Sequence, residues 1–275
     1  MKKKNLIIIG KRSFIGSNIY NILKKKKKIL LLSLKNFMKL PESEISKYDY
    51  ICNCSVNKNN VQYDYNKNLD FDYKIAKKIE KIDTTFIFLS SRKVYKPKQN
   101  ISENSKLQPI DKDSKNKLIS EKFLKKKLKS KLLILRISNV IGLKKNKNYR
   151  QIHKTFFDNY LNLVKLNKKI EFHDQFKDFI SIEQLSKIFF LILKKKLHGI
   201  YNVSLGQKIY VNEILKWLNK SNKNKKNFIR KKISREEIKR YSFSLNNSKL
   251  HRTINYKPKK SELKKFCIKL SKIIH

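Results

Sequence analysis

The strongest constraint on the fold is a pattern in the first half of the chain, where short apolar runs alternate with segments of helical periodicity. The apolar runs contain few polar residues, as strands do when both faces of their sheet are covered. Alternation of such strands with helices predicts an α/β fold with a parallel sheet between two helical layers. The predicted strands are 5–9, 29–34, 49–54, 84–89 and 131–136, and the predicted helices are 14–24, 68–82 and 113–128.

The second half is less regular, and we expect it to form a smaller α/β lobe over residues 151–275 against a core of residues 1–150. Together they would make one structural unit, and the 169–181 region is a candidate to return to the core. The segment 220–235 is rich in Lys and Asn and predicts a surface excursion. The remaining patterns predict helices at 151–166, 182–195, 211–219 and 260–273, and strands at 169–173 and 199–203.

The charge of the chain first indicates a polyanion as partner. It has 68 Lys+Arg against 21 Asp+Glu, a formal net charge of +47, which is typical of nucleic-acid binders. Only 8 of the basic residues are Arg, however, and Arg is the better residue for bidentate phosphate and base contacts. We therefore interpret the charge mainly as surface composition of the kind an AT-rich genome favours. Specific nucleic-acid binding stays an alternative.

The cysteines and apolar runs predict a cytoplasmic protein without a membrane partner. Cys52, Cys54 and Cys267 are too few for a disulfide framework. We expect Cys52 and Cys54 to lie on opposite faces of a strand, and the histidines show no ligand spacing, so no metal site is predicted. The apolar run that follows the first four residues is too short for a signal peptide, and no run approaches the roughly 18 apolar residues of a membrane span.

The first predicted strand ends in a turn with two glycines, Gly10 and Gly16, that continues into a helix. A glycine at the strand end permits a tight turn, and one in the helix permits close packing. The amides of the helix N-terminus are then available to a pyrophosphate. Ser13 stands where a middle glycine is usual, so these residues alone are equally consistent with an ordinary strand–helix turn.

Nine segments carry a further signal in their order along the chain: 6–17, 49–56, 86–95, 103–109, 117–121, 136–142, 177–182, 199–203 and 248–258. Together they resemble the extended short-chain dehydrogenase/reductases of the NAD-dependent epimerase/dehydratase family. The resemblance implies a Rossmann-type doubly wound parallel sheet with a small C-terminal substrate lobe. It also implies an NAD(P)-dependent epimerase or 4-keto reductase that acts on a nucleotide-activated sugar, for example in surface polysaccharide synthesis.

The same resemblance implies a catalytic Ser/Thr, Tyr and Lys, of which Ser91 and Lys117 occupy two positions. Asp113 stands at the Tyr position. A carboxylate beside Lys117 would stay ionised and be a poor acid near neutral pH. Three interpretations stay open: a dinucleotide-binding or regulatory protein without this chemistry, a substitute acid such as Asp113 or Tyr95, and substrate-assisted chemistry.

The resemblance also implies the binding residues. Dehydratases carry an acid pair after the catalytic Ser/Thr, and Arg92 and Lys93 stand there, so dehydration is the least favoured reaction. The second strand ends without an acidic residue that could bind the adenosine ribose, so the prediction favours NADP weakly over NAD. A homodimer through helices 68–82 and 113–128 is expected.

The implied cofactor residues are Gly10, Arg12, Ser13, Phe14, Ile15, Gly16, Ser33, Lys35, Cys54, Ser55 and Lys117. The implied substrate residues are Ser91, Asn139, Arg150 and Lys177.

Overall fold

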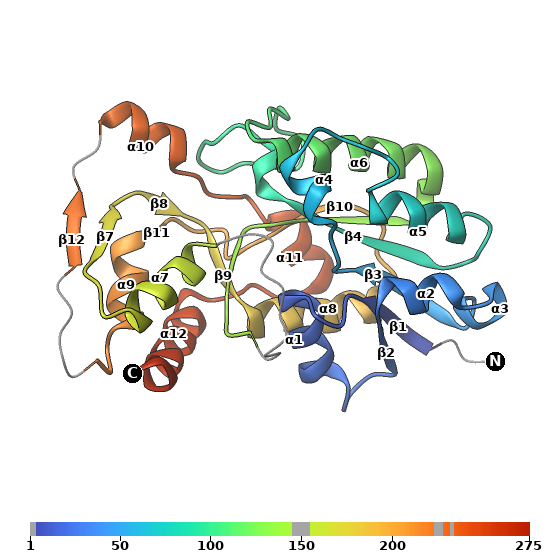
Figure 1. The fold of residues 1–275 in the computed structure, drawn as a ribbon, viewed down its shortest axis with the longest axis horizontal. Helices are drawn as coiled ribbons and strands as arrows, with labels where there is room; N and C mark the ends of the chain where they lie inside the picture. The colour runs from blue at the N-terminus through green and yellow to red at the C-terminus, as the bar shows by residue number, and fades with distance from the viewer. Residues whose placement is uncertain (1–3, 145–154, 223–227, 232–233) are drawn as a thin grey trace.

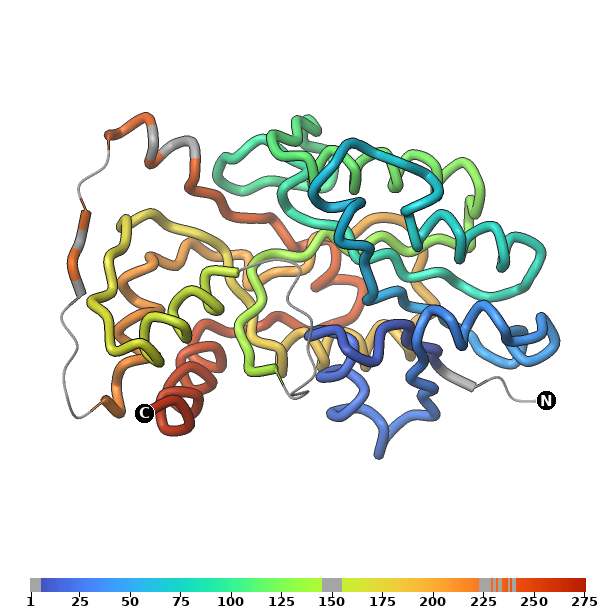
Figure 2. The backbone as a smooth tube through the Cα atoms, viewed as in Figure 1, coloured from blue at the N-terminus to red at the C-terminus, as the bar shows by residue number. Residues whose placement is uncertain are grey.

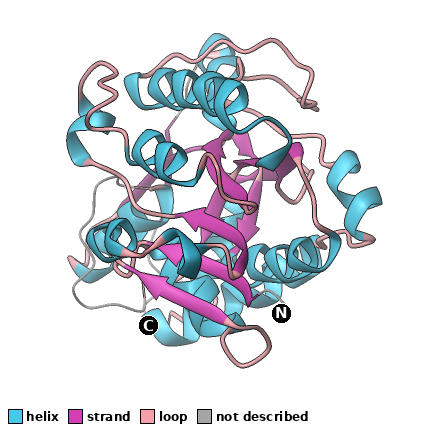
Figure 3. Cartoon of the chain, turned by 90° about the vertical axis from the view of Figure 1, so that its right-hand side faces the viewer, coloured by secondary structure: helices cyan, strands magenta, loops and turns pink. Residues whose placement is uncertain are grey.

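A computed structural model describes residues 4–144, 155–222, 228–231 and 234–275. A six-stranded sheet of parallel pairs lies at its centre, between helices on both faces (Figure 1, Figure 3). This arrangement confirms the predicted α/β fold with its doubly wound parallel sheet. The strands, in their order across the sheet, are β10 (Gly199–Val203), β5 (Leu132–Ile137), β4 (Thr85–Ser91), β3 (Tyr48–Asn53), β1 (Lys4–Ile9) and β2 (Ile29–Leu32).

Alternate side chains of β1 enter two separate cores. Leu6 and Ile8 pack in the core that α1 (Phe14–Leu23) and α8 (Ile182–Lys195) cover. Ile7 and Ile9 pack on the other face, beneath α2 (Leu34–Lys39), α5 (Phe71–Ile79) and α6 (Lys112–Leu128). All four side chains are fully buried, and each such burial contributes on the order of 2 kcal/mol. The run of apolar residues in this strand is therefore explained by its two covered faces.

The prediction for β2 is wrong in two respects. The strand ends at Leu32 rather than residue 34, because the Ser33 side chain accepts a hydrogen bond from the backbone of Asn36 and begins α2. Its residues are half-buried rather than buried on both faces, because β2 is an edge strand.

The order of the strands creates a topological switch point at the carboxyl edge of the sheet. The chain leaves β1 for the outer strand β2 and then returns on the other side of β1 as β3. The connections from β1 and β3 therefore leave the sheet on opposite faces. Ligands of open α/β sheets bind at such a switch point, beyond the carboxyl ends of the strands.

The described part of the second half contains three small two-stranded sheets, and this part of the chain lies beside the central sheet (Figure 1, Figure 2). The strand that returns to the central sheet is β10, whereas the strands between residues 170 and 181 pair outside it. The small sheets pair β6 (Asn139–Ile141) with β9 (Phe179–Ser181), β7 (Ile170–His173) with β12 (Phe228–Lys231), and β8 (Phe176–Lys177) with β11 (Ile209–Tyr210).

Most predicted helices are confirmed, and α8 has the predicted bounds. The predicted helix 151–166 is described from residue 155, where Thr155 and Asp158 form a capping box; residues 151–154 lie outside the described part. No described helix is long and apolar enough to cross a membrane. The other helices are α3 (Glu42–Ile45), α4 (Lys58–Gln62), α7 (Phe156–Lys165), α9 (Val211–Leu218), α10 (Arg235–Tyr241), α11 (Ser248–Ile254) and α12 (Lys260–Ile274).

Candidate dinucleotide and catalytic site

The glycine turn lies at the switch point of the sheet. Gly10 has a φ of +120°, a conformation that side chains of L-residues rarely adopt, and a Cβ there would lie 3.0 Å from the Ser55 backbone nitrogen. A Cβ on Gly16 would lie 3.0 Å from the Cys54 Cβ. Ser13 accepts a hydrogen bond from the Gly16 N–H at 2.8 Å and caps α1. The two glycines thus let α1 approach β3 closely, as the sequence predicts.

Cys52 and Cys54 lie on the same face of their strand, so their predicted placement on opposite faces is wrong. Their Sγ atoms are 3.7 Å apart, because side chains of a strand repeat every two residues and positions i and i+2 share a face. Burial raises the pKa of the Cys52 thiol well above its ordinary value. Within the described residues no group of three or more His, Cys, Asp or Glu could hold a metal ion.

The other residues predicted for the cofactor follow β1 and β2, in the connections to α1 and α2 and in the first turns of these helices. Phe14 and Ile15 begin α1 and are half-buried, whereas Arg12 is exposed in the turn. Ser33 and Lys35 follow β2, with Lys35 exposed on the first turn of α2. A glycine turn and a capped helix N-terminus at the switch point fit a dinucleotide.

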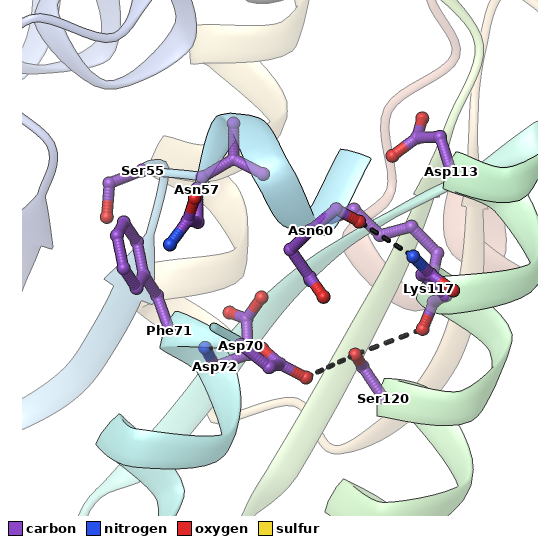
Figure 4. A pocket seen from close by; sticks show the side chains of 11 residues that line it. Ser55, Asn57, Asn60, Asp70, Phe71, Asp72, Asp113, Lys117 and Ser120 are labelled. Atoms are coloured by element: carbon purple, nitrogen blue, oxygen red, sulfur yellow. Dashed lines mark hydrogen bonds between the residues drawn. The ribbon is translucent and has the colours of Figure 1, made fainter. Parts of the chain in front are cut away.

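Lys117 and Asp113 line one pocket between α6 and α5 (Figure 4). The capping box of Asp111 and Ser114 begins α6 and fixes its first turn, which carries Asp113. The Lys117 Nζ lies 4.8 Å from the centroid of the Phe88 ring, over β4. Ser55 lines the same pocket, so predicted catalytic and cofactor residues meet there.

Asp72 was not predicted from the sequence, although it is one of three carboxyl groups that line this pocket, with Asp70 and Asp113. Asp72 is buried in the first turn of α5 and accepts a hydrogen bond from the Asn53 side chain at 2.8 Å. Burial raises its pKa to about 7, against the opposing charge of Lys117. In Figure 4 it lies beside Asp70, across the pocket from Asp113.

Asn116 was also missed by the sequence analysis. Its amide donates to the carbonyl oxygens of Asn60 and Tyr63 at 2.7 and 2.9 Å. These bonds fasten α4 and its end against α6, one residue before Lys117. The α4 segment therefore forms one wall of the pocket, which Asn60 also lines.

Tyr95 is not available to replace the missing tyrosine. It is buried, its hydroxyl donates to Asn202 at 2.9 Å, and it accepts from Arg136 at 2.7 Å. Burial raises its pKa above the ordinary value, although Arg136 opposes that shift. A hydroxyl with both roles filled in the interior cannot reach a substrate, so the interpretation of Tyr95 as a substitute acid is wrong.

Tyr95 belongs to a buried polar network that joins β4, α6, β5 and β10. Arg136 binds Glu121 through two hydrogen bonds of 2.9 and 2.5 Å, and both side chains are almost fully buried. Ser90 donates to the same carboxylate at 2.5 Å. Burial alone would lower the pKa of Arg136, but the hydrogen bonds and charge of Glu121 raise it. These are residues of the resembling segments, and here they have a structural role.

Ser91 ends β4, and its hydroxyl oxygen accepts the backbone N–H of Lys93 at 3.2 Å. The Lys93 side chain binds Asp111 at 2.9 Å, which connects this turn to the beginning of α6. Ser91 thus lies at the carboxyl edge of the sheet, where the resemblance predicts a residue that orients the substrate.

The predicted substrate residues are dispersed. Asn139 donates to the Asp178 carbonyl at 2.9 Å and so joins β6 to β9. Lys177 lines a second pocket, in the lobe, whose walls include Tyr160, Phe172 and Gln175. Burial and the charges of nearby cations lower the pKa of Lys177 to about 8. Arg150 lies outside the described residues.

The model of the NAD dependent epimerase/dehydratase family matches residues 6–204, most of the chain. The chain belongs to this family. It is accordingly a member of an enzyme family that uses NAD(P) and includes nucleotide-sugar epimerases and dehydratases. No curated protein matches it significantly in sequence.

Solved structures support the fold. The chain is similar to UDP-N-acetylglucosamine 4-epimerase from Methanobrevibacter ruminantium in complex with UDP-N-acetylmuramic acid, with a TM-score of 0.78, 20% identity and coverage of 99% and 98% of the two chains. For UDP-glucose 4-epimerase from Thermotoga maritima with UDP-glucose, the values are 0.74, 15%, 98% and 97%. For RMD from Pseudomonas aeruginosa complexed with NADPH, they are 0.75, 16%, 99% and 97%.

Proposed function

We propose that this enzyme binds NAD(P) at the glycine turn and epimerises, or reduces at a 4-keto group, a nucleotide-activated sugar held between the core and the lobe. The carrying observation is the turn at the switch point, where Gly10 and Gly16 leave no room for a Cβ. The family match and the nucleotide sugars bound by similar structures support the same assignment.

The cofactor, when bound, accepts or donates a hydride, and the chain's residues hold and protonate the sugar. In this proposal Ser91 orients the reacting sugar oxygen and Lys117 holds the cofactor ribose. Asp113 stands where the family has a tyrosine, and a carboxylic acid, being a stronger acid than a phenol, is the poorer store of a proton for the sugar oxygen. We therefore expect turnover to be limited by protonation of the sugar oxygen.

The lobe pocket is the proposed place for the nucleotide. Its walls combine the aromatic rings of Phe172 and Tyr160 with the Lys177 ammonium group. The Gln175 side-chain oxygen lines it and is buried with no hydrogen-bond partner among the described residues. An aromatic wall, a cation and an unsatisfied acceptor suit a base and its phosphates.

The variant Asp113→Tyr tests this function. Purified wild type and variant would be assayed for NAD(P)H formation and sugar interconversion with UDP- and GDP-sugars. We expect the variant to gain at least tenfold in turnover, because a tyrosine near Lys117 supplies both proton transfers. Asp64→Asn, at an exposed carboxylate, is the control. A wild type that turns over, and that Lys117→Ala does not impair, would contradict the proposal.

The second candidate is a dinucleotide-binding protein without turnover. It is favoured by Asp113 at the tyrosine position and by the commitment of Tyr95 to the buried network. Cofactor binding to the wild type, with no turnover in either wild type or Asp113→Tyr, would select it. The homodimer through α5 and α6 stays a prediction, for which sedimentation velocity is the measurement.

A further inference from the structure

Three cationic side chains meet between Ser91 and the lobe pocket: Arg92, Lys93 and Lys177, called here the cation cluster. The Arg92 guanidinium carbon lies 3.7 Å from the centroid of the Phe243 ring. The Phe243 N–H donates to the carbonyl of Phe176, the residue before Lys177. Arg92, from the end of β4, therefore packs beside β8 of the lobe.

The cluster holds more positive charge than the described chain compensates. Asp111 binds Lys93 at 2.9 Å, and its charge also acts on Arg92. The charges that act on Lys177 are those of Arg92 and Lys93, both of the same sign. Burial lowers the pKa of Arg92 to about 10. Half-buried groups of like charge oppose folding, and they are typical of sites that bind an anion.

The cluster has two ends. Lys177 is at the pocket end, where the proposed function places the nucleotide and its phosphates. Arg92 and Lys93 are at the other end, directly after Ser91, whose hydroxyl oxygen accepts the Lys93 N–H. A diphosphate near Lys177 leaves this end, beside the reacting sugar, with two cations against the single carboxylate of Asp111.

We propose that the substrate is an acidic sugar, a nucleotide-linked hexuronate or carboxyalkyl hexose, whose carboxylate binds Arg92 with Lys93 beside it. The inference rests on the proposed function and specifies its substrate class. Arg is suited to this role because its planar guanidinium group binds a carboxylate through two parallel hydrogen bonds. The ring of Phe243 holds that plane in place.

Calorimetric titration of the NAD-loaded protein with matched ligand pairs tests the inference. The pairs are UDP-glucuronate against UDP-glucose and GDP-mannuronate against GDP-mannose, at 0.15 M salt where exposed charges are screened. We expect the uronate of one pair to bind at least tenfold more tightly than its neutral partner. Because a chain of charge +47 favours any additional anion, the site-specific part must come from variants.

Arg92→Gln should reduce the uronate preference to less than threefold and leave the affinity for the neutral sugar unchanged. Lys96→Gln removes an exposed cation from the same loop and should retain the preference. Lys93→Gln is a second variant, and thermal unfolding establishes that each variant is folded. Equal affinities within each pair, or equal effects of Arg92→Gln and Lys96→Gln, would overturn the inference alone. Binding of neither member of either pair would overturn the proposed function as well.

Discussion

The buried network includes Glu121 of α6. The pocket includes Lys117 of the same helix and Asp72 of α5, and these two residues are called here the rim. The network and the rim differ in how their charges are satisfied. Glu121 has two hydrogen bonds from Arg136 and one from Ser90. In the rim, Asp72 is buried with a neutral amide as its hydrogen-bond donor, and its pKa is raised. The network is organised as a structural core, whereas the rim retains the kind of incompletely neutralised charge that a ligand site requires.

The largest effect is expected from breaking the network. Glu121→Ala leaves the buried Arg136 without its carboxylate, and removal of one partner of such a pair costs roughly 3–5 kcal/mol. Urea unfolding would measure the loss. Asp64→Ala, which removes the exposed pair with Lys112, should cost less than about 1 kcal/mol. Similar losses in both variants would contradict the distinction between the buried network and an exposed ion pair.

A substitution at Gly10, compared with one at Gly199, separates the cost of positive φ from the cost of close contact with the Ser55 backbone. Gly10→Ala adds a Cβ at 3.0 Å from the Ser55 nitrogen and at positive φ, which should cost roughly 1–3 kcal/mol and weaken NAD(P) binding more than tenfold. Gly199→Ala is the matched control, because Gly199 also has positive φ but nothing lies within 4 Å of its Cβ position. Cofactor fluorescence should show unchanged binding there. Equal weakening in both would refute a direct role of Gly10.

The raised pKa of Asp72 makes the free energy of unfolding depend on pH. From about pH 4 to pH 7 the folded state holds a proton at Asp72 that the unfolded state has released, so the free energy of unfolding falls as pH rises in this window. The slope is at most roughly 1.4 kcal/mol per pH unit. Asp72→Asn removes this contribution. Its stability relative to the wild type should therefore increase between pH 5 and pH 7 in urea titrations.

Asp178 also contributes to the pH dependence of the free energy of unfolding, but its contribution cancels when the two proteins are compared. Its pKa is also raised to about 7, by burial, although the backbone N–H groups of Leu205, Gly206 and Leu245 oppose the shift. Because Asp178 is present in both proteins, it cancels in the comparison. An unchanged difference between wild type and Asp72→Asn across the window would show that Asp72 is ionised throughout.

The sequence was sufficient for the sheet and the glycine turn because both depend on local patterns, namely apolar runs and two glycines at fixed spacing. It was insufficient for the rim. Asp72 and Lys117 are 45 positions apart, and nothing in the pattern around Asp72 distinguishes it from a surface residue at a helix start. The network residues Tyr95, Glu121 and Arg136 were recognised individually, but their mutual hydrogen bonds depend on the packing of separate elements.

The smallest expected effect concerns the residues that follow β1 and β2, where the lean towards NADP rests on exposed charge. Lys35 lies on the first turn of α2, and Arg12 is exposed in the glycine turn. Lys35→Glu would repel a 2′-phosphate and favour a ribose hydroxyl, so the ratio of NADP to NAD affinity should fall about threefold to fivefold. Lys39→Glu, exposed near the other end of α2, carries the same charge change and should leave the ratio unaltered. Raising the salt concentration should reduce the Lys35 effect, since exposed charges are screened. Identical ratios of NADP to NAD affinity in the two variants would show that cofactor preference depends on the shape of the adenosine site rather than on the charge of Lys35.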